Sequence, residues 1–116
     1  MKKSLVILSL ICSFSAMADS GYKCFGTEPF WGMELTQNKL IFGLFPEDRT
    51  VEDVLSKEIA QGTGEDYAFV VTTKNATATV IAGECSDGMS DKIYSHHVVY
   101  KNSTATLYGC CDKNSK

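Results

Sequence analysis

Residues 31–45 read WGMELTQNKLIFGLF, and this stretch decides the fold class. Trp31, Met33 and Leu35 are apolar at every second position and alternate with small or polar residues, a period of two that is typical of a β-strand with one buried face. A turn at 37–39 follows, and the next run is apolar on both faces. The stretch therefore predicts a β-hairpin.

Four later runs also have the composition of strands. They are rich in Thr, Val, Tyr and Ile, which strands prefer, and they span 67–73, 76–85, 94–101 and 104–111. Polar turns separate them. We therefore expect an all-β domain, a small antiparallel β-barrel or sandwich of about six or more strands.

The segment 47–60 has a different pattern. Its apolar residues recur at helical spacing: Val51, Val54, Leu55 and Ile59. Thr50 precedes them at an N-cap position, and Asp53 follows it in the first turn. The pattern predicts one short helix in this segment, and an irregular strand is the alternative.

Residues 1–18 have the pattern of a secretory signal peptide. Lys2 and Lys3 form a basic start, residues 5–14 are apolar, and Ala-Met-Ala at the end fits the small-x-small cleavage rule. The apolar run is shorter than the about 20 residues that span a bilayer. We therefore expect a cleaved leader, a periplasmic or secreted protein, and a single mature domain over 19–116.

Attachment to a membrane would depend on Cys12. A lipid-modified cysteine at a new N-terminus needs a small residue directly before it, and Ile11 occupies that position. We therefore expect membrane association only if Cys12 is lipidated, which Ile11 disfavours.

The charge of the chain excludes two classes of partner. The formal charge is −3, and loss of Lys2 and Lys3 with the leader leaves 9 basic and 14 acidic side chains, a charge of −5. No cluster of Lys or Arg occurs in the sequence. Nucleic acid and anionic membranes both require such clusters, so we expect neither as a partner.

Four cysteines remain in the mature chain, and they predict two structural disulfides. Adjacent Cα atoms lie about 3.8 Å apart, below the usual disulfide range of about 4.4–6.8 Å, which argues against a bridge between Cys110 and Cys111. On a strand these two side chains point to opposite faces, so each should pair with a different partner, Cys24 or Cys85. Spacing alone leaves both remaining pairings open. A redox-active C-x-x-C motif is absent from the sequence.

The stretch 28–31, EPFW, contains the first candidate binding residues. Pro29 fixes its own φ and biases Glu28 to an extended conformation. Phe30 and Trp31 then point to opposite sides, and the alternation with Met33 assigns Trp31 to the core and Phe30 to the surface beside Glu28. An aromatic corner that closes the barrel end is favoured over a ligand site.

The stretch 85–91, CSDGMSD, contains the second group of candidates. Glu84, Asp87 and Asp91 lie close together in sequence, but their spacing does not match a calcium-binding loop. Asp87-Gly88 is also a turn dipeptide, in which the Asp side chain bonds the backbone and Gly takes a positive φ. The turn is favoured over a metal site.

His96 and His97 should point to opposite faces of one strand, so they do not form a joint metal site. His97 shares a face with Lys101, which places His97 outward and His96 inward. No serine lies in a nucleophile-elbow pattern, and no nucleophile and base are placed together by the sequence.

Three motifs in this order resemble a family of small, uncharacterised bacterial envelope proteins and lipoproteins: C-x-G-x-E-P-F-W, C-x-D-G-M-S-D and L-x-G-C-C. The resemblance covers Cys24 to Cys111 and implies export and a β fold, but no activity. It also implies the pairs Cys24–Cys111 and Cys85–Cys110, with Glu28 and Asp87 at one end of the barrel. The positions that it marks for testing are Glu28, Pro29, Phe30, Trp31, Asp87, Gly88, Met89, Ser90 and Asp91.

We therefore expect a non-enzymatic, inhibitor-type or binding β domain whose partner is a protein or another cell-envelope component, without a cofactor or a metal. The candidate binding residues are Glu28, Phe30, Trp31, Asp87, Ser90 and Asp91. The alternative is a binder of a small ligand or a divalent metal at an acidic corner formed by Glu28, Asp87 and Asp91, with His96 as a further ligand. An enzymatic role ranks last because no catalytic arrangement is visible.

Overall fold

The computed structural model describes residues 21–27, 29–44 and 49–114. The predictions about the leader at 1–18, about Cys12 and about Glu28 lie outside these residues, as does the start of the predicted helix at 47–48.

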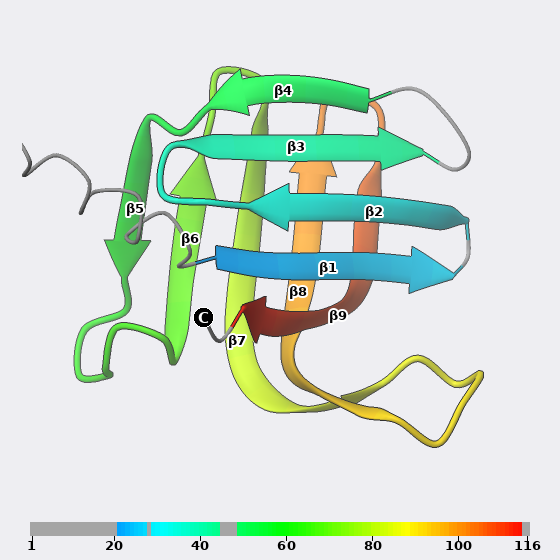
Figure 1. Ribbon diagram of the computed structural model, residues 1–116. Helices are drawn as coiled ribbons and strands as arrows, with labels where there is room; N and C mark the ends of the chain where they lie inside the picture. Colours follow the sequence, from blue (N-terminus) through cyan, green and yellow to red (C-terminus); the bar gives the residue numbers. More distant parts are fainter. Residues whose placement is uncertain (1–20, 28, 45–48, 115–116) are drawn as a thin grey trace, which may run out of the picture.

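The described chain forms one antiparallel sheet of nine strands that curls into a half-barrel, as the all-β prediction expected (Figure 1). The order across the sheet is β4-β3-β2-β1-β9-β8-β7-β6-β5. The strands are β1 (Gly21–Thr27), β2 (Phe30–Leu35), β3 (Lys39–Leu44), β4 (Arg49–Asp53), β5 (Ser56–Ile59), β6 (Ala68–Thr72), β7 (Ala76–Ser86), β8 (Ile93–Asn102) and β9 (Thr106–Asn114).

Six of the nine strands correspond to the six runs predicted from the sequence, and β1, β4 and β5 are additional. The predicted hairpin is confirmed, because β2 and β3 pair from Leu35–Leu40 to Trp31–Leu44. The turn between them is closed by Thr36, whose N–H donates to the Lys39 carbonyl over 2.9 Å.

The predicted short helix is wrong, and the irregular-strand alternative is correct. Among the described residues the segment forms β4 and β5, with a break at Val54 and Leu55. The Val54 N–H donates to the Asn38 carbonyl next to β3, and the Leu55 N–H donates to the Thr72 carbonyl of β6. The chain therefore passes from one edge of the sheet to the other, and tertiary hydrogen bonds outweigh the helical spacing. Val51, Leu55 and Ile59 are 60%, 66% and 42% exposed, so they do not form one buried face.

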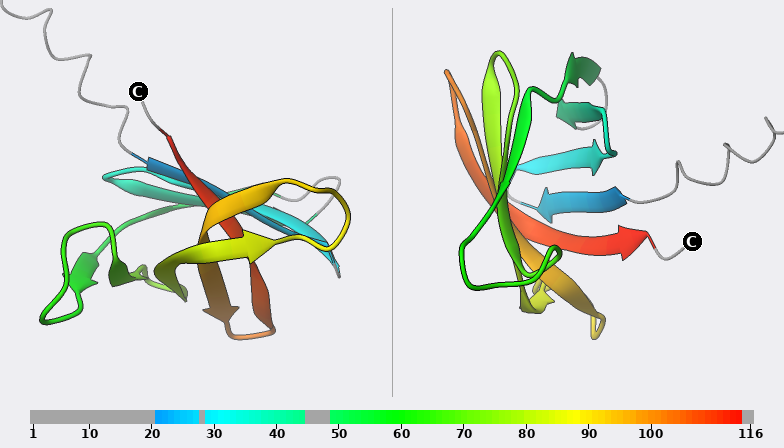
Figure 2. Two further views of the ribbon diagram at one scale, coloured as in Figure 1. Left: turned by 90° about the horizontal axis from the view of Figure 1, so that it is seen from below. Right: turned by 90° about the vertical axis from the view of Figure 1, so that its left-hand side faces the viewer.

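The sheet bends so that β1 to β4 cross the direction of β5 to β8, and the core lies on the inner side of the bend (Figures 1 and 2). Phe42 and Tyr100 stack there with ring centroids 4.1 Å apart, and Trp31 lies against both rings. Each such side chain buries about 150–250 Å². At about 25 cal/mol per Å², each contributes several kcal/mol as an upper estimate.

Two glycines make room for Trp31. A Cβ at Gly26 would lie 2.0 Å from the indole Nε1, and a Cβ at Gly109 would lie 2.1 Å from the Phe25 carbonyl oxygen and 2.9 Å from the indole. Trp31 is 3% exposed, which confirms its predicted place in the core. The indole therefore packs directly on the backbones of β1 and β9.

The two disulfides are Cys24–Cys111 and Cys85–Cys110, the pairing that the family resemblance implied. Cys24 and Cys111 are register partners on β1 and β9 and lie in the core. Cys110 points to the outer face, as the alternation along a strand requires, and Cys85 reaches it from the hairpin of β7 and β8. One disulfide therefore joins β1 to β9 on the inner face of the sheet. The other fastens the β7–β8 hairpin to β9 on the outer face.

A bulge in β7 redirects this hairpin. Ala82 pairs with His96 and Cys85 pairs with Tyr94, so β7 contains one extra residue at this point. Gly83 lies in the bulge with a φ of 154°, which residues with a side chain rarely adopt. Beyond the bulge the hairpin extends past β9 at the end of the sheet where β1 ends (Figure 1).

Candidate functional site

The outer face of β1 to β4 is hollowed into a groove with a volume of about 580 Å³. Small-molecule sites commonly have volumes of about 300–1,000 Å³. Its floor is a row of register partners, Phe25 on β1, Gly32 on β2 and Gly43 on β3, and Arg49 on β4 continues this row. We call this depression, with the side chains at its rim, the outer groove.

The outer groove exists because two adjacent outward positions have no side chain. A Cβ at Gly32 would meet only the Cys24 carbonyl oxygen, at 3.9 Å, which is ordinary contact. Gly43 lies directly beside Gly32 on the next strand, so the bare floor spans two strands. In the neighbouring row the outward residues are Glu34 and Ile41, whose side chains form a wall.

The rim of the outer groove is apolar and exposed. Phe30 is 51% exposed, Leu44 is 42% exposed and Met89 is 66% exposed, and all three line the groove. Large apolar side chains around a concave site are typical of ligand-binding grooves.

Met89 is presented to the outer groove by a tight turn. The Asp87 Oδ1 atom accepts hydrogen bonds from the N–H groups of Met89, over 2.8 Å, and Ser90, over 3.1 Å, and Gly88 has a φ of 77°. The predicted Asp-Gly turn is therefore confirmed.

The hairpin that carries this turn is fastened to the outer face at several points. Besides the Cys85–Cys110 disulfide, Tyr94 packs edge-on against Phe25 with ring centroids 4.8 Å apart. Lys92 lies over the Tyr94 ring and pairs with Asp112 over 3.2 Å. Phe25, a floor residue, is therefore held in place by the same hairpin that supplies Met89.

The structure brings some of the predicted site residues together and separates others. Phe30, Trp31 and Asp87 line the outer groove, although Trp31 reaches it only as a buried core residue. Ser90 and Asp91 are exposed in the loop and do not line the groove. The predicted approach of Glu28 to Asp87 concerns a residue outside the described range.

Sequence reasoning missed Gly32, Gly43 and Arg49. The two glycines occur in Trp-Gly and Phe-Gly pairs of the predicted hairpin, at outward positions that register brings together. The repeated aromatic-Gly pair was the sequence feature that could have indicated a floor without side chains. Nothing in the sequence pattern distinguished Arg49, which the sheet places at the end of the floor.

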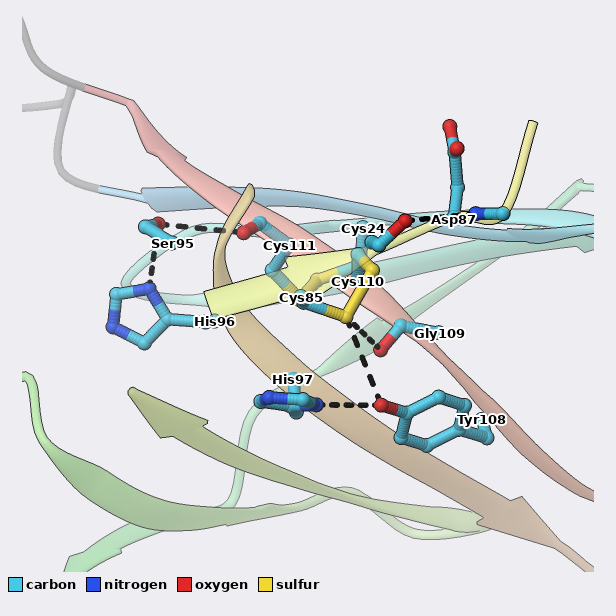
Figure 3. Close-up of a disulfide and its surroundings, with 12 residues drawn as sticks. Cys24, Cys85, Asp87, Ser95, His96, His97, Tyr108, Gly109, Cys110 and Cys111 are labelled. Carbon is cyan, nitrogen blue, oxygen red and sulfur yellow. Dashed lines mark hydrogen bonds between the residues drawn. A yellow bond between two sulfur atoms is a disulfide. The ribbon is translucent and has the colours of Figure 1, made fainter. Parts of the chain in front are cut away.

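The metal-binding alternative finds no support in the part of the chain that the structure describes, where no group of three His, Cys, Asp or Glu side chains could hold an ion. The predicted orientations of the histidines are confirmed: His96 is 6% exposed and faces inward, whereas His97 contacts the Tyr108 hydroxyl on the outside (Figure 3).

His96 contacts Ser95 (Figure 3) and the Asp66 backbone, which together form a polar cluster. Its Nε2 lies 2.9 Å from the Asp66 carbonyl oxygen, which can only accept, so Nε2 carries the proton. Nδ1 lies 2.7 Å from the Ser95 hydroxyl, which also lies 3.3 Å from the Cys111 carbonyl oxygen. A serine and a base in this arrangement can suggest a nucleophile, but the Ser95 N–H bonds the Asp112 carboxylate, whose negative charge opposes an oxyanion beside Ser95. We conclude that this cluster is structural.

The same cluster closes one end of the half-barrel. The Asp66 carboxylate accepts from Lys113 and from the Tyr22 hydroxyl, and these hydrogen bonds lower the pKa of Asp66. Burial, followed by the adjacent Asp66, raises the pKa of Tyr22 above its ordinary value. These contacts tie the loop before β6 to β1 and β9.

No family model, no curated protein and no solved structure matches this chain. The class that the fold itself defines is a disulfide-bonded, all-β half-barrel with an apolar groove on its outer face. The resemblance to bacterial envelope proteins stays a prediction.

Within the described residues no helix is long and apolar enough to cross a membrane.

Proposed function

We propose that this protein is an exported, non-enzymatic binding domain of the bacterial cell envelope and that the outer groove is its binding site. The observation that carries the proposal is the bare Gly32–Gly43 floor between exposed apolar side chains. Two disulfides in so short a chain are compatible with an oxidising compartment. The envelope is therefore where we expect the partner.

The fastening of the hairpin supports a binding role. A disulfide, an aromatic contact and an ion pair hold the loop that lines one end of the groove. A site that is rigid before its ligand arrives loses less conformational entropy on binding. This arrangement favours a preformed site.

Filling the floor tests the proposal. The full chain, expressed for export and purified, is compared with Gly32→Leu, whose side chain would occupy the groove. The matched control is Gly64→Leu, at a loop glycine where an added Cβ meets nothing within 4 Å. Both variants should keep a free energy of unfolding, measured in urea, within about 1 kcal/mol of the parent value.

Each immobilised protein is then exposed to solubilised bacterial envelope, and the retained lipids and proteins are identified by mass spectrometry. We expect the parent and Gly64→Leu to retain the same component and Gly32→Leu to lose it. Equal retention by all three folded proteins, or retention of nothing by the folded parent, would overturn the proposal.

A further inference from the structure

Arg49 stands where two cavities meet. It ends the floor row of the outer groove, and it also lines a second cavity of about 400 Å³ at the open edge of the half-barrel, together with Phe42 and Tyr100. Leu44 borders both cavities as well. Arg49 is the only arginine in the sequence. A guanidinium at this position can reach a group bound at the end of the groove.

Arg49 has no ion-pair partner within the described part of the chain, although Glu52 lines the second cavity together with it. Lys39 pairs with Asp53, Lys92 with Asp112 and Lys113 with Asp66. The Arg49 side chain forms no ion pair and no hydrogen bond with any described residue. Lys23, the other cation of the groove, lies in register between Glu34 and Asp112, so its charge is compensated nearby. The Arg49 guanidinium is therefore the groove cation that can pair with a bound anion.

The end of the outer groove near Asp87 disfavours an anion. Asp87 lies there with one carboxylate oxygen already bonded to two N–H groups, and its negative charge repels an anion. Beside it lie Met89 and Phe30, which are more than half exposed. Met is flexible and polarisable and adapts to an apolar chain. The two ends of the groove therefore differ: one has the Arg49 cation, and the other has exposed apolar side chains beside Asp87.

The length of the outer groove suits one extended chain. It crosses from β4 to β1, which is three inter-strand spacings, or about 14 Å. Its floor of two glycines is narrow because side chains of the neighbouring row, Glu34 and Ile41, stand beside it.

We infer that the outer groove binds a single-chain anionic amphiphile, a fatty acid with its carboxylate at Arg49 and its chain directed along Gly43 and Gly32 toward Met89. This inference rests on the proposed function and specifies the ligand. A groove this short and narrow admits one chain, so the occupant is a monomeric amphiphile and not a membrane surface.

Dodecanoate below its micelle concentration is the probe, titrated calorimetrically and by quenching of Trp31 with a bromine-labelled analogue. Trp31 is the only tryptophan and borders the outer groove. We expect saturable one-to-one binding that weakens about tenfold or more in Arg49→Gln, because a charge-assisted contact is lost. Lys101→Gln removes the same charge on β8, away from the groove, and should bind like the parent.

Two further ligands separate the two ends of the site. Dodecanol, which lacks the carboxylate, should bind to the parent more weakly than dodecanoate does. Its affinity for the parent and for Arg49→Gln should be the same. Dodecyltrimethylammonium, which carries the opposite charge, should bind more weakly still. Gly32→Leu should abolish the binding of all three, whereas Gly64→Leu should not.

The outcomes distinguish the inference from the proposed function. If dodecanoate does not bind while Gly32→Leu still abolishes retention of an envelope component, the ligand class is wrong and the groove remains the site. If Arg49→Gln binds dodecanoate as tightly as the parent, the carboxylate assignment is wrong. Binding to phosphatidylglycerol vesicles without binding of monomeric dodecanoate would replace the inference with a membrane-docking surface. If neither dodecanoate nor any envelope component is retained, both proposals fail.

Discussion

The inner and outer faces of the sheet around β1 use glycine for opposite purposes. On the inner face Gly26 and Gly109 lack side chains because the Trp31 indole fills the space against their backbones. On the outer face Gly32 and Gly43 also lack side chains, and no described side chain comes near the place of the missing Cβ at Gly32. The comparison teaches that the same residue type marks a packed core on one side and a vacant site on the other.

The largest expected effect comes from adding one methyl group to an inner-face glycine. In Gly109→Ala the new Cβ would lie 2.1 Å from the Phe25 carbonyl oxygen, so β1 and β9 must separate. We expect a loss of more than about 3 kcal/mol in the free energy of unfolding, because backbone cannot yield as a flexible side chain can. Urea unfolding followed by Trp31 fluorescence measures it.

Gly32→Ala is the paired substitution on the outer face. Its nearest contact would be at 3.9 Å, so we expect no loss and a gain of up to about 1 kcal/mol, since glycine weakens a strand interior. If the two variants lose the same stability, the outer groove is not open as described.

The two disulfides extend the comparison to the covalent links of the inner and outer faces, for which only upper limits can be given. Cys24–Cys111 closes 87 residues in the core and Cys85–Cys110 closes 25 residues on the outside. In the chain-entropy model these loops are worth at most about 4.5 and about 3.5 kcal/mol. We expect the double alanine variant of the inner pair to lose more stability, measured by urea unfolding.

The two disulfide variants should also differ in where they loosen the molecule. Loss of Cys85–Cys110 should raise amide hydrogen exchange mainly around Met89, because this bridge fastens the hairpin to the outer face. Loss of Cys24–Cys111 should raise exchange across β1 and β9. The comparison fails if both variants give the same exchange pattern.

The smallest expected effect concerns Asp66 at the end of the inner face. Hydrogen bonds from Lys113 and Tyr22 lower its pKa in the folded state, so the ionised carboxylate stabilises the fold above its ordinary pKa of about 4. This stabilisation is lost as the pH falls through the lowered folded value. Because the Asp66 side chain is 44% exposed, we expect Asp66→Asn to lose at most about 1 kcal/mol at neutral pH.

Stability curves of Asp66→Asn and the parent should therefore converge as the pH falls below about 4. Asp91→Asn, in the exposed loop, removes a charge with no described ion pair and serves as the control. A difference between Asp66→Asn and the parent that persists at acidic pH would show that Asp66 acts through geometry and not through its charge.

The fold class and the orientation of several side chains could be predicted from the sequence because they depend on local alternation. Trp31 and His96 point inward, and Phe30 and His97 point outward, as the period of two requires. The Asp87-Gly88 turn also follows from residues within one tight turn. The predicted helix around Val51 failed because pairing with β3 is a contact between segments that local spacing does not report.

By itself the sequence determined an all-β chain with its strands, turns and inward side chains, because alternation and turn chemistry act over a few residues. Tertiary structure alone decided the outer groove. Gly32, Gly43 and Arg49 come from three strands and meet only through register. Met89 reaches them only because a bulge and a disulfide turn its hairpin onto the outer face. A concave site depends on which side chains are absent across neighbouring strands, and that information exists only once the strands are paired.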